Sequence, residues 1–111
     1  MRTLLLACTL FCFTTADARD IYVKYRADPV DVDNGHFQEM SLQPSSLVQQ
    51  IFYDSDNRYL LVDLNGTIYH YCGIPPTVVA SWIGAPSLGS FYNQQVKGRF
   101  DCRTGHVPSY P

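Results

Sequence analysis

The chain has 111 residues, of which 46% are hydrophobic and 14% aromatic, and its formal net charge is -2. This length fits one small domain, and this hydrophobic content is enough for a packed core. The near-neutral charge excludes a global electrostatic attraction to nucleic acid or to an anionic membrane surface.

The first residues have the pattern of an export signal. A positive start, Met1-Arg2, precedes an apolar run from Leu4 to Phe13 and a small-x-small cleavage site at Ala16-Asp17-Ala18. The run is too short to span a bilayer, which requires about 20 apolar residues. We therefore expect a signal peptide over residues 1–18 and a periplasmic or secreted mature chain that begins at Arg19.

The expected cleavage of the signal peptide determines which cysteines remain in the mature chain. Cleavage would remove Cys8 and Cys12 and would leave Cys72 and Cys102 in the mature chain. Two cysteines that remain in an oxidising compartment are expected to pair, whereas a nucleophilic cysteine is the alternative. We predict a disulfide between Cys72 and Cys102.

Residues 19–43 are predicted to form an N-terminal extension. Alternation of apolar and polar residues over 21–25 indicates a short strand. Asn34-Gly35 favours a type I′ turn, which would set Val32 opposite Phe37 in a hairpin. We expect the extension either to add strands at the edge of a sheet or to be a flexible tail.

The same extension contains a string that is similar to a calcium-binding loop. Asp31, Asp33 and the following Asn-Gly fit its start, but the glycine comes one position early and Leu42 stands where the loop needs a bidentate glutamate. The histidines lack the spacing of zinc ligands. They are His36, His70 and His106. No metal site and no cofactor is predicted.

The clearest element is the hairpin over residues 58–73. Asn65-Gly66 favours a type I′ turn that sets Leu64 opposite Thr67. Pairing continues from this turn, so one face carries only uncharged residues and is assigned to the core. These residues are Leu60, Val62, Leu64, Tyr69 and Tyr71. The other face is mixed and carries Tyr59, Leu61, Asp63, Ile68, His70 and Cys72.

A strand precedes this hairpin and two helices follow it. Residues 47–54 are predicted to form the strand. Residues 76–83 begin with proline, which is favoured at the first helical position, and place their apolar side chains on one face. Ser87 is the predicted N-cap of a second helix that ends at Gly98. The predicted fold is a small α+β domain over residues 44–111, in which a three-stranded antiparallel sheet is followed by two short helices packed on one face.

Several short motifs occur between Ser45 and Phe100. They are Ser45-Ser46, Ile51, Tyr53-Asp54, Asn65-Gly66, Tyr69-His70-Tyr71, Ile74-Pro75, Ala85-Pro86-Ser87-Leu88-Gly89 and Phe91-Tyr92-Asn93. Together they make this stretch similar to the KTSC domain, a family named after the C-terminal region of some lysyl-tRNA synthetases and also found as stand-alone bacterial proteins. Cys72 and Trp82 depart from the family pattern. The resemblance implies a small α+β unit and, through the synthetase, RNA binding, but it carries over no catalytic residue.

The Tyr-x-Tyr motif has two interpretations. Tyr69 and Tyr71 either stack on a ligand, as aromatic residues do in single-strand binders, or lie under the helices with their hydroxyls bonded at the edge of the core. We favour the core. His70 lies on the opposite face and is predicted to be exposed or in a second layer.

A basic cluster lies at the end of the second predicted helix. Lys97, Arg99 and Arg103 are close in sequence there and fit a nucleic-acid contact, although the helix dipole also favours cations at this position. The predicted binding residues of the whole chain are Tyr69, His70, Tyr71, Tyr92, Asn93, Lys97 and Arg99.

Catalytic motifs are absent from the sequence. It has no glycine-rich phosphate loop, no nucleophile elbow and no metal motif, and Asp54, Asp56 and Asp63 are explained as solvated residues. We therefore expect an exported, non-enzymatic binding module that recognises a protein or a cell-envelope component, as an inhibitor or accessory protein. The alternative is an RNA-binding domain that uses the sheet tyrosines and the basic helix end.

Overall fold

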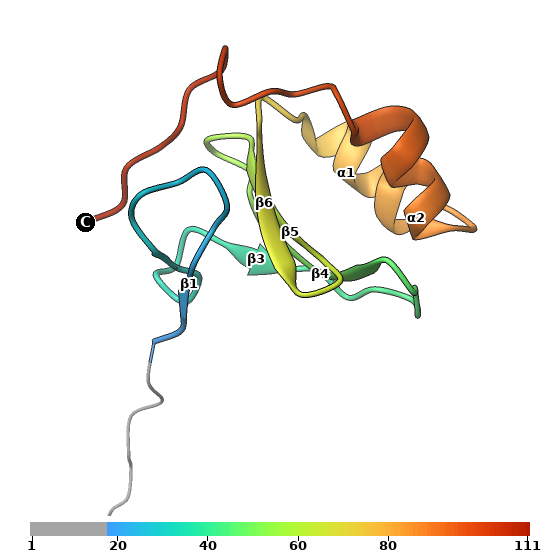
Figure 1. The fold of residues 1–111 in the computed structure, drawn as a ribbon, viewed down its shortest axis with the longest axis horizontal. Helices are drawn as coiled ribbons and strands as arrows, with labels where there is room; N and C mark the ends of the chain where they lie inside the picture. Colours follow the sequence, from blue (N-terminus) through green and yellow to red (C-terminus); the bar gives the residue numbers. More distant parts are fainter. Residues whose placement is uncertain (1–17) are drawn as a thin grey trace, which may run out of the picture.

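The computed structural model describes residues 18–111, so the predicted signal peptide lies outside the described residues except for Ala18. A four-stranded antiparallel sheet of order β3-β4-β5-β6 forms the centre, and a second sheet pairs β1 with β2. The strands are β1 (Asp20–Ile21), β2 (Val30–Asp31), β3 (Gln38–Glu39), β4 (Val48–Asp54), β5 (Tyr59–Leu64) and β6 (Thr67–Cys72). The helices α1 (Pro76–Ile83) and α2 (Leu88–Phe91) and the π-helical segment η2 (Tyr92–Val96) lie on one side of the central sheet (Figure 1).

The predicted α+β class is confirmed, and the central sheet has one strand more than the three predicted for residues 44–111. The additional strand is β3, which comes from the N-terminal extension and pairs Gln38 with Tyr53 and Glu39 with Phe52. The extension therefore adds strands, and its first strand ends at Ile21 rather than continuing to Tyr25.

The second predicted hairpin, around Asn34-Gly35, was also wrong. The side chain of Asp31 accepts a hydrogen bond from the Asp33 amide at 2.8 Å, and that of Asn34 accepts one from the His36 amide at 2.8 Å. These local turns compete with strand pairing for the backbone amides. As a result, β2 pairs back onto β1 instead of pairing with the residues around Phe37.

The central hairpin has the predicted register. Asn65 and Gly66 both have positive φ angles, 54° and 95°, and Leu64 is opposite Thr67. The carboxylate of Asp63 accepts a hydrogen bond from the Gly66 amide at 2.6 Å, which fixes the turn further. Each residue of β6 is therefore assigned to one face of the sheet by the turn chemistry alone.

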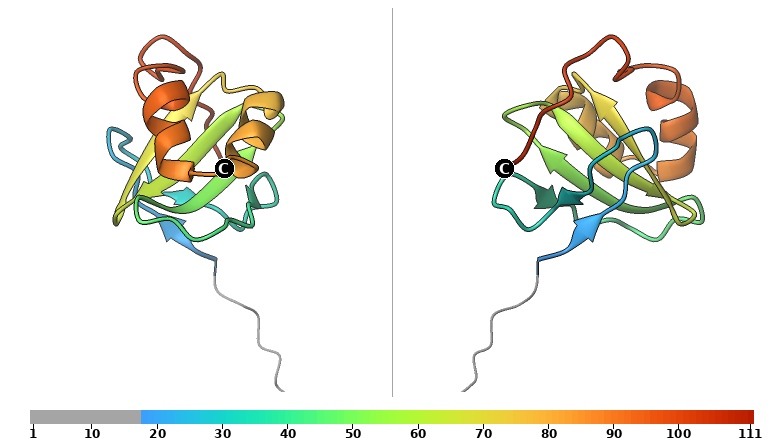
Figure 2. Two further views of the ribbon diagram at one scale, coloured as in Figure 1. Left: turned by 90° about the vertical axis from the view of Figure 1, so that its right-hand side faces the viewer. Right: turned by 60° about the vertical axis from the view of Figure 1, so that its left-hand side comes forward.

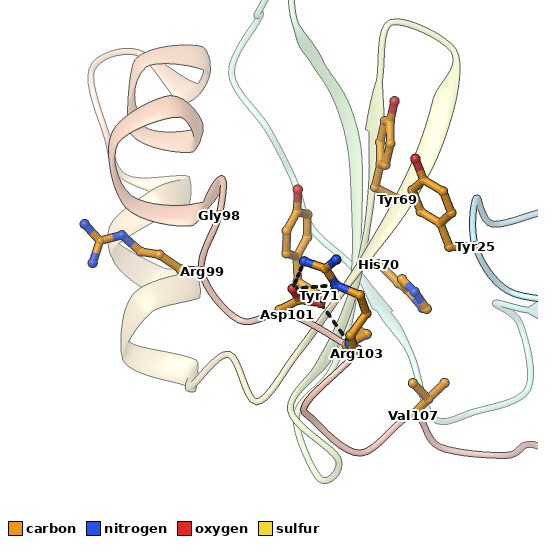
Figure 3. Close-up of a pocket in the computed structure, with 10 residues that line it drawn as sticks. Tyr25, Tyr69, His70, Tyr71, Gly98, Arg99, Asp101, Arg103 and Val107 are labelled. Carbon is orange, nitrogen blue, oxygen red and sulfur yellow. Dashed lines mark hydrogen bonds and ion pairs between the residues drawn. The ribbon is translucent and has the colours of Figure 1, made fainter.

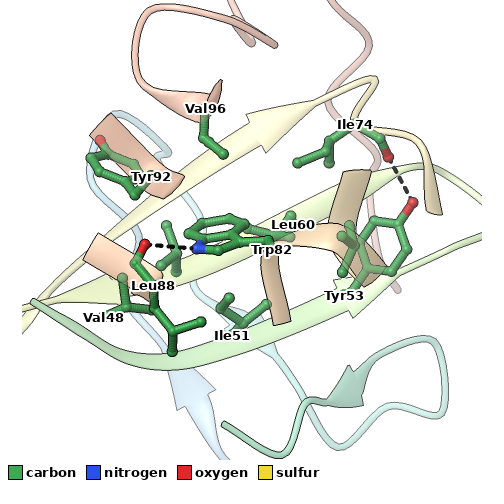
Figure 4. Close-up of a cluster of buried hydrophobic side chains, with 11 residues drawn as sticks. Val48, Ile51, Tyr53, Leu60, Ile74, Trp82, Leu88, Tyr92 and Val96 are labelled. Carbon is green, nitrogen blue, oxygen red and sulfur yellow. Dashed lines mark hydrogen bonds between the residues drawn. The ribbon is translucent and has the colours of Figure 1, made fainter. Parts of the chain in front are cut away.

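The helices cover the face that was predicted to form the core. Trp82 is fully buried at its centre, and its indole nitrogen donates a hydrogen bond to the Leu88 carbonyl at 3.1 Å (Figure 4). The hydroxyl of Tyr53 donates to the Ile74 carbonyl at 2.6 Å, so the polar atoms of both rings are satisfied within the core. This cluster contains Val48, Ile51, Tyr53, Leu60, Val62, Ile74, Val79, Trp82, Leu88, Tyr92 and Val96.

The opposite face of the sheet is buried as well. Tyr59 and Leu61 have no exposed surface, because the N-terminal extension and the C-terminal tail lie over them (Figure 2). A strand buried on both sides reads as a continuous apolar run, as Tyr59 to Val62 does. This second cluster contains Val23, Val30, Val32, Phe52, Tyr59, Leu61 and Cys72, with Phe37 and Tyr110 packed against it.

The second helix begins as predicted and changes type halfway. The Ser87 hydroxyl accepts a hydrogen bond from the Ser90 amide at 3.2 Å, which caps α2. The Lys97 amide donates to the Tyr92 carbonyl at 2.8 Å, a spacing of five residues that defines the π turn of η2. The helical region ends at Val96, two residues before Gly98. Within residues 18–111, neither α1 nor any other helix is long and apolar enough to cross a membrane.

Candidate functional site

A pocket of about 610 Å³ lies beside β6. Three segments line it: β6 itself, the loop that follows β1, and the chain that follows η2 (Figure 3). Its lining residues are Tyr25, Tyr69, His70, Tyr71, Gly98, Arg99, Asp101, Cys102, Arg103 and Val107.

The pocket lies against the edge of the strand rather than on one face of the sheet. Successive side chains of a strand point to opposite faces, so Tyr69 and Tyr71 lie on the helix side and His70 on the other. All three nevertheless line the same pocket. Since β6 is the last strand of the sheet, no further strand of residues 18–111 covers its outer edge, and this edge forms one wall.

Tyr71 connects this wall to the second helix. Its hydroxyl shares a hydrogen bond of 2.6 Å with the hydroxyl of Tyr92, and the two rings meet edge to face at 6.1 Å between centroids. Burial and, after it, this hydrogen bond raise the pKa of Tyr71 well above its ordinary value. Tyr71 therefore remains a neutral phenol and forms a rigid part of the pocket wall.

His70 is hydrogen-bonded to Tyr59 of the second cluster. The Tyr59 hydroxyl lies 2.8 Å from its Nδ1 and accepts a hydrogen bond from Arg26 Nη1 at 3.1 Å. With its oxygen accepting from Arg26, the Tyr59 hydroxyl is oriented to donate its own hydrogen bond to Nδ1 of a neutral ring that carries its hydrogen on Nε2. Burial first and the positive charge of Arg26 second lower the pKa of His70, while Asp101 opposes them. The imidazole is therefore a neutral hydrogen-bonding group at physiological pH.

Asp101 and Arg103 form an ion pair in the lining of the pocket. Arg103 Nη2 and Nε donate to Asp101 Oδ2 at 2.6 and 2.9 Å, and the Arg103 amide donates to Oδ1 at 2.8 Å. These bonds lower the pKa of Asp101, so the carboxylate stays ionised. The side chain of Arg99 points away from this pair, toward the helices (Figure 3).

A polar network behind the pocket joins distant parts of the chain. The guanidinium of Arg26 lies over the rings of Tyr59 and Tyr110, at 5.6 and 5.8 Å, and donates to the Pro108 carbonyl at 3.0 Å. The Tyr110 hydroxyl donates to Asp54 at 2.6 Å. Asp54 is only 1% exposed, so its assignment as a solvated residue was wrong. Asp54 also accepts a hydrogen bond from the nearby Asn57 side chain at 2.7 Å, but its contact with the C-terminal tail is not revealed by any local pattern.

The two predicted disulfide cysteines lie at bonding distance. The sulfur atoms of Cys72 and Cys102 are 2.12 Å apart, and Cys102 lines the pocket. The bond ties the end of β6 to the chain that follows η2. It thereby holds two of the three pocket segments together.

The pocket contains some of the predicted binding residues and omits others. Tyr69, His70, Tyr71 and Arg99 line it, whereas Tyr92 lies one layer behind. Asn93 and Lys97 are exposed on the helical side and do not contribute. Sequence reasoning missed several lining residues, because their segments reach β6 only through tertiary contacts. They are Tyr25, Asp101 and Val107, whereas Arg103 was predicted only as part of the basic cluster.

The chemistry of the pocket suits binding. Aromatic rings and a disulfide supply apolar surface, and an ion pair and an imidazole supply fixed polar groups, which is the usual composition of a ligand pocket. Among residues 18–111, no group of three His, Cys, Asp or Glu side chains is arranged to hold a metal ion.

The fold and the pocket define a small disulfide-bonded α+β domain with an aromatic edge pocket. The KTSC domain model matches residues 44–100, half of the chain, and the chain therefore belongs to the KTSC domain family. Tyr25 and the residues from Asp101 onward lie outside the match. The family domain supplies the lining from β6 and from Gly98 and Arg99, and the flanking segments of this chain supply the rest.

Known proteins are similar to between 50% and 59% of the chain. A lysine–tRNA ligase of Nostoc punctiforme is 32% identical over 56 residues, which are 50% of this chain and 10% of that protein. An "Uncharacterized protein" of Stutzerimonas stutzeri is 38% identical over 61 residues, 54% of this chain and 84% of that protein. The crystal structure of a KTSC domain protein from Yersinia pestis superposes with a TM-score of 0.53 at 32% identity, over 59% of this chain and 92% of the other.

Proposed function

We propose that this chain is an exported, non-enzymatic binding module that recognises a protein or cell-envelope partner through the pocket beside β6. The observation that carries the proposal is that the polar groups of this pocket are hydrogen-bonded to other groups of the protein. His70, Tyr71 and Asp101 each have a partner within the protein, namely Tyr59, Tyr92 and Arg103. Groups that are fixed in this way favour recognition of a ligand over transfer of protons to it.

Export is supported by the cysteines and by the first residues of the chain. A disulfide between Cys72 and Cys102 persists in the periplasm or outside the cell, where thiols are not kept reduced. N-terminal sequencing of the protein recovered from these compartments tests the proposal. It is expected to start at Arg19, and recovery of the chain only from the cytosol with Met1 retained contradicts export.

Partner recognition is tested with two exposed tyrosines. Tyr25 is 81% exposed and lines the pocket, while Tyr22 is 78% exposed and does not. The oxidised chain is immobilised and incubated with envelope and periplasmic extract, and the captured material is compared with that of Tyr25→Ala and Tyr22→Ala. Capture is expected to be lost with Tyr25→Ala and kept with Tyr22→Ala. Equal capture by all three chains, or none, contradicts the proposal.

RNA binding is the second candidate function. The presence of the aromatic side chains of Tyr69 and Tyr71 in one pocket favours it, as does the name of one relative, a tRNA ligase. The ion pair of Arg103 with Asp101 opposes it, because that cation is already neutralised. A titration with single-stranded RNA at low and high salt separates the two functions, since the absence of binding at low salt removes this candidate.

A further inference from the structure

The outer edge of β6 has an alternating pattern of hydrogen bonds. Leu64 and Thr67 flank the two-residue turn and form a hydrogen-bonded pair. The pairs two and four residues further along, Val62 with Tyr69 and Leu60 with Tyr71, therefore also exchange backbone hydrogen bonds within the hairpin. The amide and carbonyl groups of Ile68, His70 and Cys72 consequently point away from β5. These three residues are the positions at which another chain can pair with β6.

Two of the three positions are already in use. The Lys24 amide donates to the Ile68 carbonyl at 2.7 Å, and the Cys72 amide donates to the Phe100 carbonyl at 2.8 Å. We call Lys24 and Phe100 the edge clips. Between them, the amide and the carbonyl of His70 have no bond partner within residues 18–111.

Both clip segments leave the strand sharply. Tyr25, directly after the first clip, has a φ angle of 69°, and Phe100, the second clip, has a φ angle of 54°. Positive φ is uncommon and strained for aromatic residues, and such strain is concentrated at functional sites. Each segment therefore turns away from β6 after one hydrogen bond, which leaves the middle of the edge open to the pocket.

The open part of the edge has a defined length. Ile68 and Cys72 are four residues apart, about 13 Å along a strand at roughly 3.3 Å per residue. This gap accommodates about three extended residues, of which one pairs with His70. The pocket beside it, at about 610 Å³, lies within the range of ligand pockets.

We propose that the pocket binds a short extended peptide segment of the partner, which exchanges two backbone hydrogen bonds with the amide and carbonyl of His70. A donor and an acceptor on the outer edge of one strand residue match the reciprocal pair on an extended peptide residue. Tyr69 and Tyr71 on one side and the imidazole of His70 on the other contact the flanking side chains of the peptide. This inference rests on the proposed binding function and names the chemistry of its partner.

A second copy of this chain does not fit the same gap. Pairing of two β6 edges requires several consecutive free positions on each strand. The clips leave only the position of His70 free, and the clips of one copy would meet those of the other. A narrow, flexible peptide fits between the edge clips, whereas the edge of a second sheet is too long to fit there.

The test uses a displayed library of random linear peptides selected on the oxidised full chain. Synthetic copies of selected peptides are titrated against the chain, and amide hydrogen exchange is followed with and without peptide. Exchange of the His70 amide is expected to slow on binding, because the peptide carbonyl then accepts its hydrogen bond. N-methylation of single peptide residues is expected to weaken binding at alternate positions only.

Two substitutions at one position separate backbone from side chain. His70→Pro removes the outward amide and spares the ladder to β5, while His70→Val retains the amide and removes the imidazole. His70→Pro is expected to bind roughly tenfold more weakly than His70→Val. Equal affinities of the two variants overturn the inference, and hydrogen exchange on the unaltered chain decides the question if His70→Pro fails to fold.

The remaining outcomes are also decisive. Failure to select any peptide, or selected peptides that leave exchange of the His70 amide unchanged, overturns the inference. Slowed exchange that accompanies dimerisation in sedimentation, or that follows addition of single-stranded RNA alone, assigns the edge to another occupant and overturns it as well. If the extract capture still depends on Tyr25 in these cases, the proposed function stands and only the peptide inference falls.

Discussion

The phenolic oxygens of Tyr71 and Tyr92 lie 2.6 Å apart and share one hydrogen bond. This bond joins the edge strand β6 to the π-helical segment η2. Tyr92 is 7% exposed and belongs to the core, whereas Tyr71 is partly buried and lines the pocket. The two interpretations of the Tyr-x-Tyr motif are therefore compatible, because one ring can pack against the core and present its edge to a ligand.

Removal of one of these hydroxyls tests the link between strand and helix. Tyr92→Phe leaves the Tyr71 hydroxyl without its partner, so we expect the free energy of unfolding to fall by about 1 kcal/mol in urea titrations. The double variant Tyr71→Phe with Tyr92→Phe removes both groups. It is expected to lose less than the sum of the two single losses. Strictly additive losses would show that the hydroxyls do not interact in solution.

The central hairpin and the helices could be predicted because their signals are local. Asn65-Gly66 fixes the register of β5 and β6, and Ser87 caps α2 within four residues of sequence. The family motifs lie in the same region, residues 44–100. Local turn and cap chemistry therefore predicts the elements and the face that the helices cover.

The second cluster and half of the pocket could not be predicted, because they depend on contacts between residues that are distant in the sequence. β3 has only two residues and pairs with β4 through long-range packing rather than through its own propensity. Arg26 reaches Pro108 across 82 positions of sequence. Asp101 was not identified as a pocket residue, since the disulfide at Cys102 and the hydrogen bond of the Phe100 carbonyl, both to Cys72, bring it beside β6.

Loss of the disulfide is expected to destabilise the domain substantially. Cys72 and Cys102 are 30 positions apart, and closure of a loop of this length stabilises a protein by about 3 to 4 kcal/mol in the chain-entropy model. Cys72→Ser with Cys102→Ser is compared with the unaltered chain by urea unfolding, with and without a thiol reductant. The reductant is expected to weaken only the unaltered chain. Equal stability of oxidised and reduced chains would contradict the role of the bond as a structural link.

Gly105 is expected to tolerate no side chain. A Cβ atom at this position would lie 2.8 Å from Cys72 Cβ and 3.3 Å from the Asp101 carbonyl, so the tail would have to move. We expect Gly105→Ala to lower the free energy of unfolding by about 1 to 3 kcal/mol. Gly89→Ala is the matched control. Gly89 lies within α2, and a Cβ atom there would make an ordinary contact with Leu47 at 3.5 Å. The control is expected to be neutral or to stabilise by up to about 1 kcal/mol, and thermal unfolding of both variants checks the difference.

The stability of the fold should also depend on the protonation of His70. Burial and the charge of Arg26 lower the pKa of His70 below its ordinary value of 6.5. Because folding favours the neutral ring, the contribution of this residue is fully present above about pH 6.5 and is lost as the pH falls toward the lower folded pKa. The carboxyls of Asp54 and Asp101 have pKa values below 3.8, so their contributions are lost only at more acidic pH.

This prediction is checked by urea unfolding at about pH 8 and about pH 5, on the two sides of the ordinary histidine pKa. The unaltered chain is expected to lose more stability between these conditions than His70→Gln, which cannot take up the proton. His70→Gln also loses the contact with Tyr59, which lowers its stability equally at the two pH values. The protonation of His70 is therefore measured by the change in unfolding free energy between the two pH values, and not by the stability at either one. An identical pH dependence of the two chains would mean that the imidazole accepts its proton as readily in the folded as in the unfolded chain.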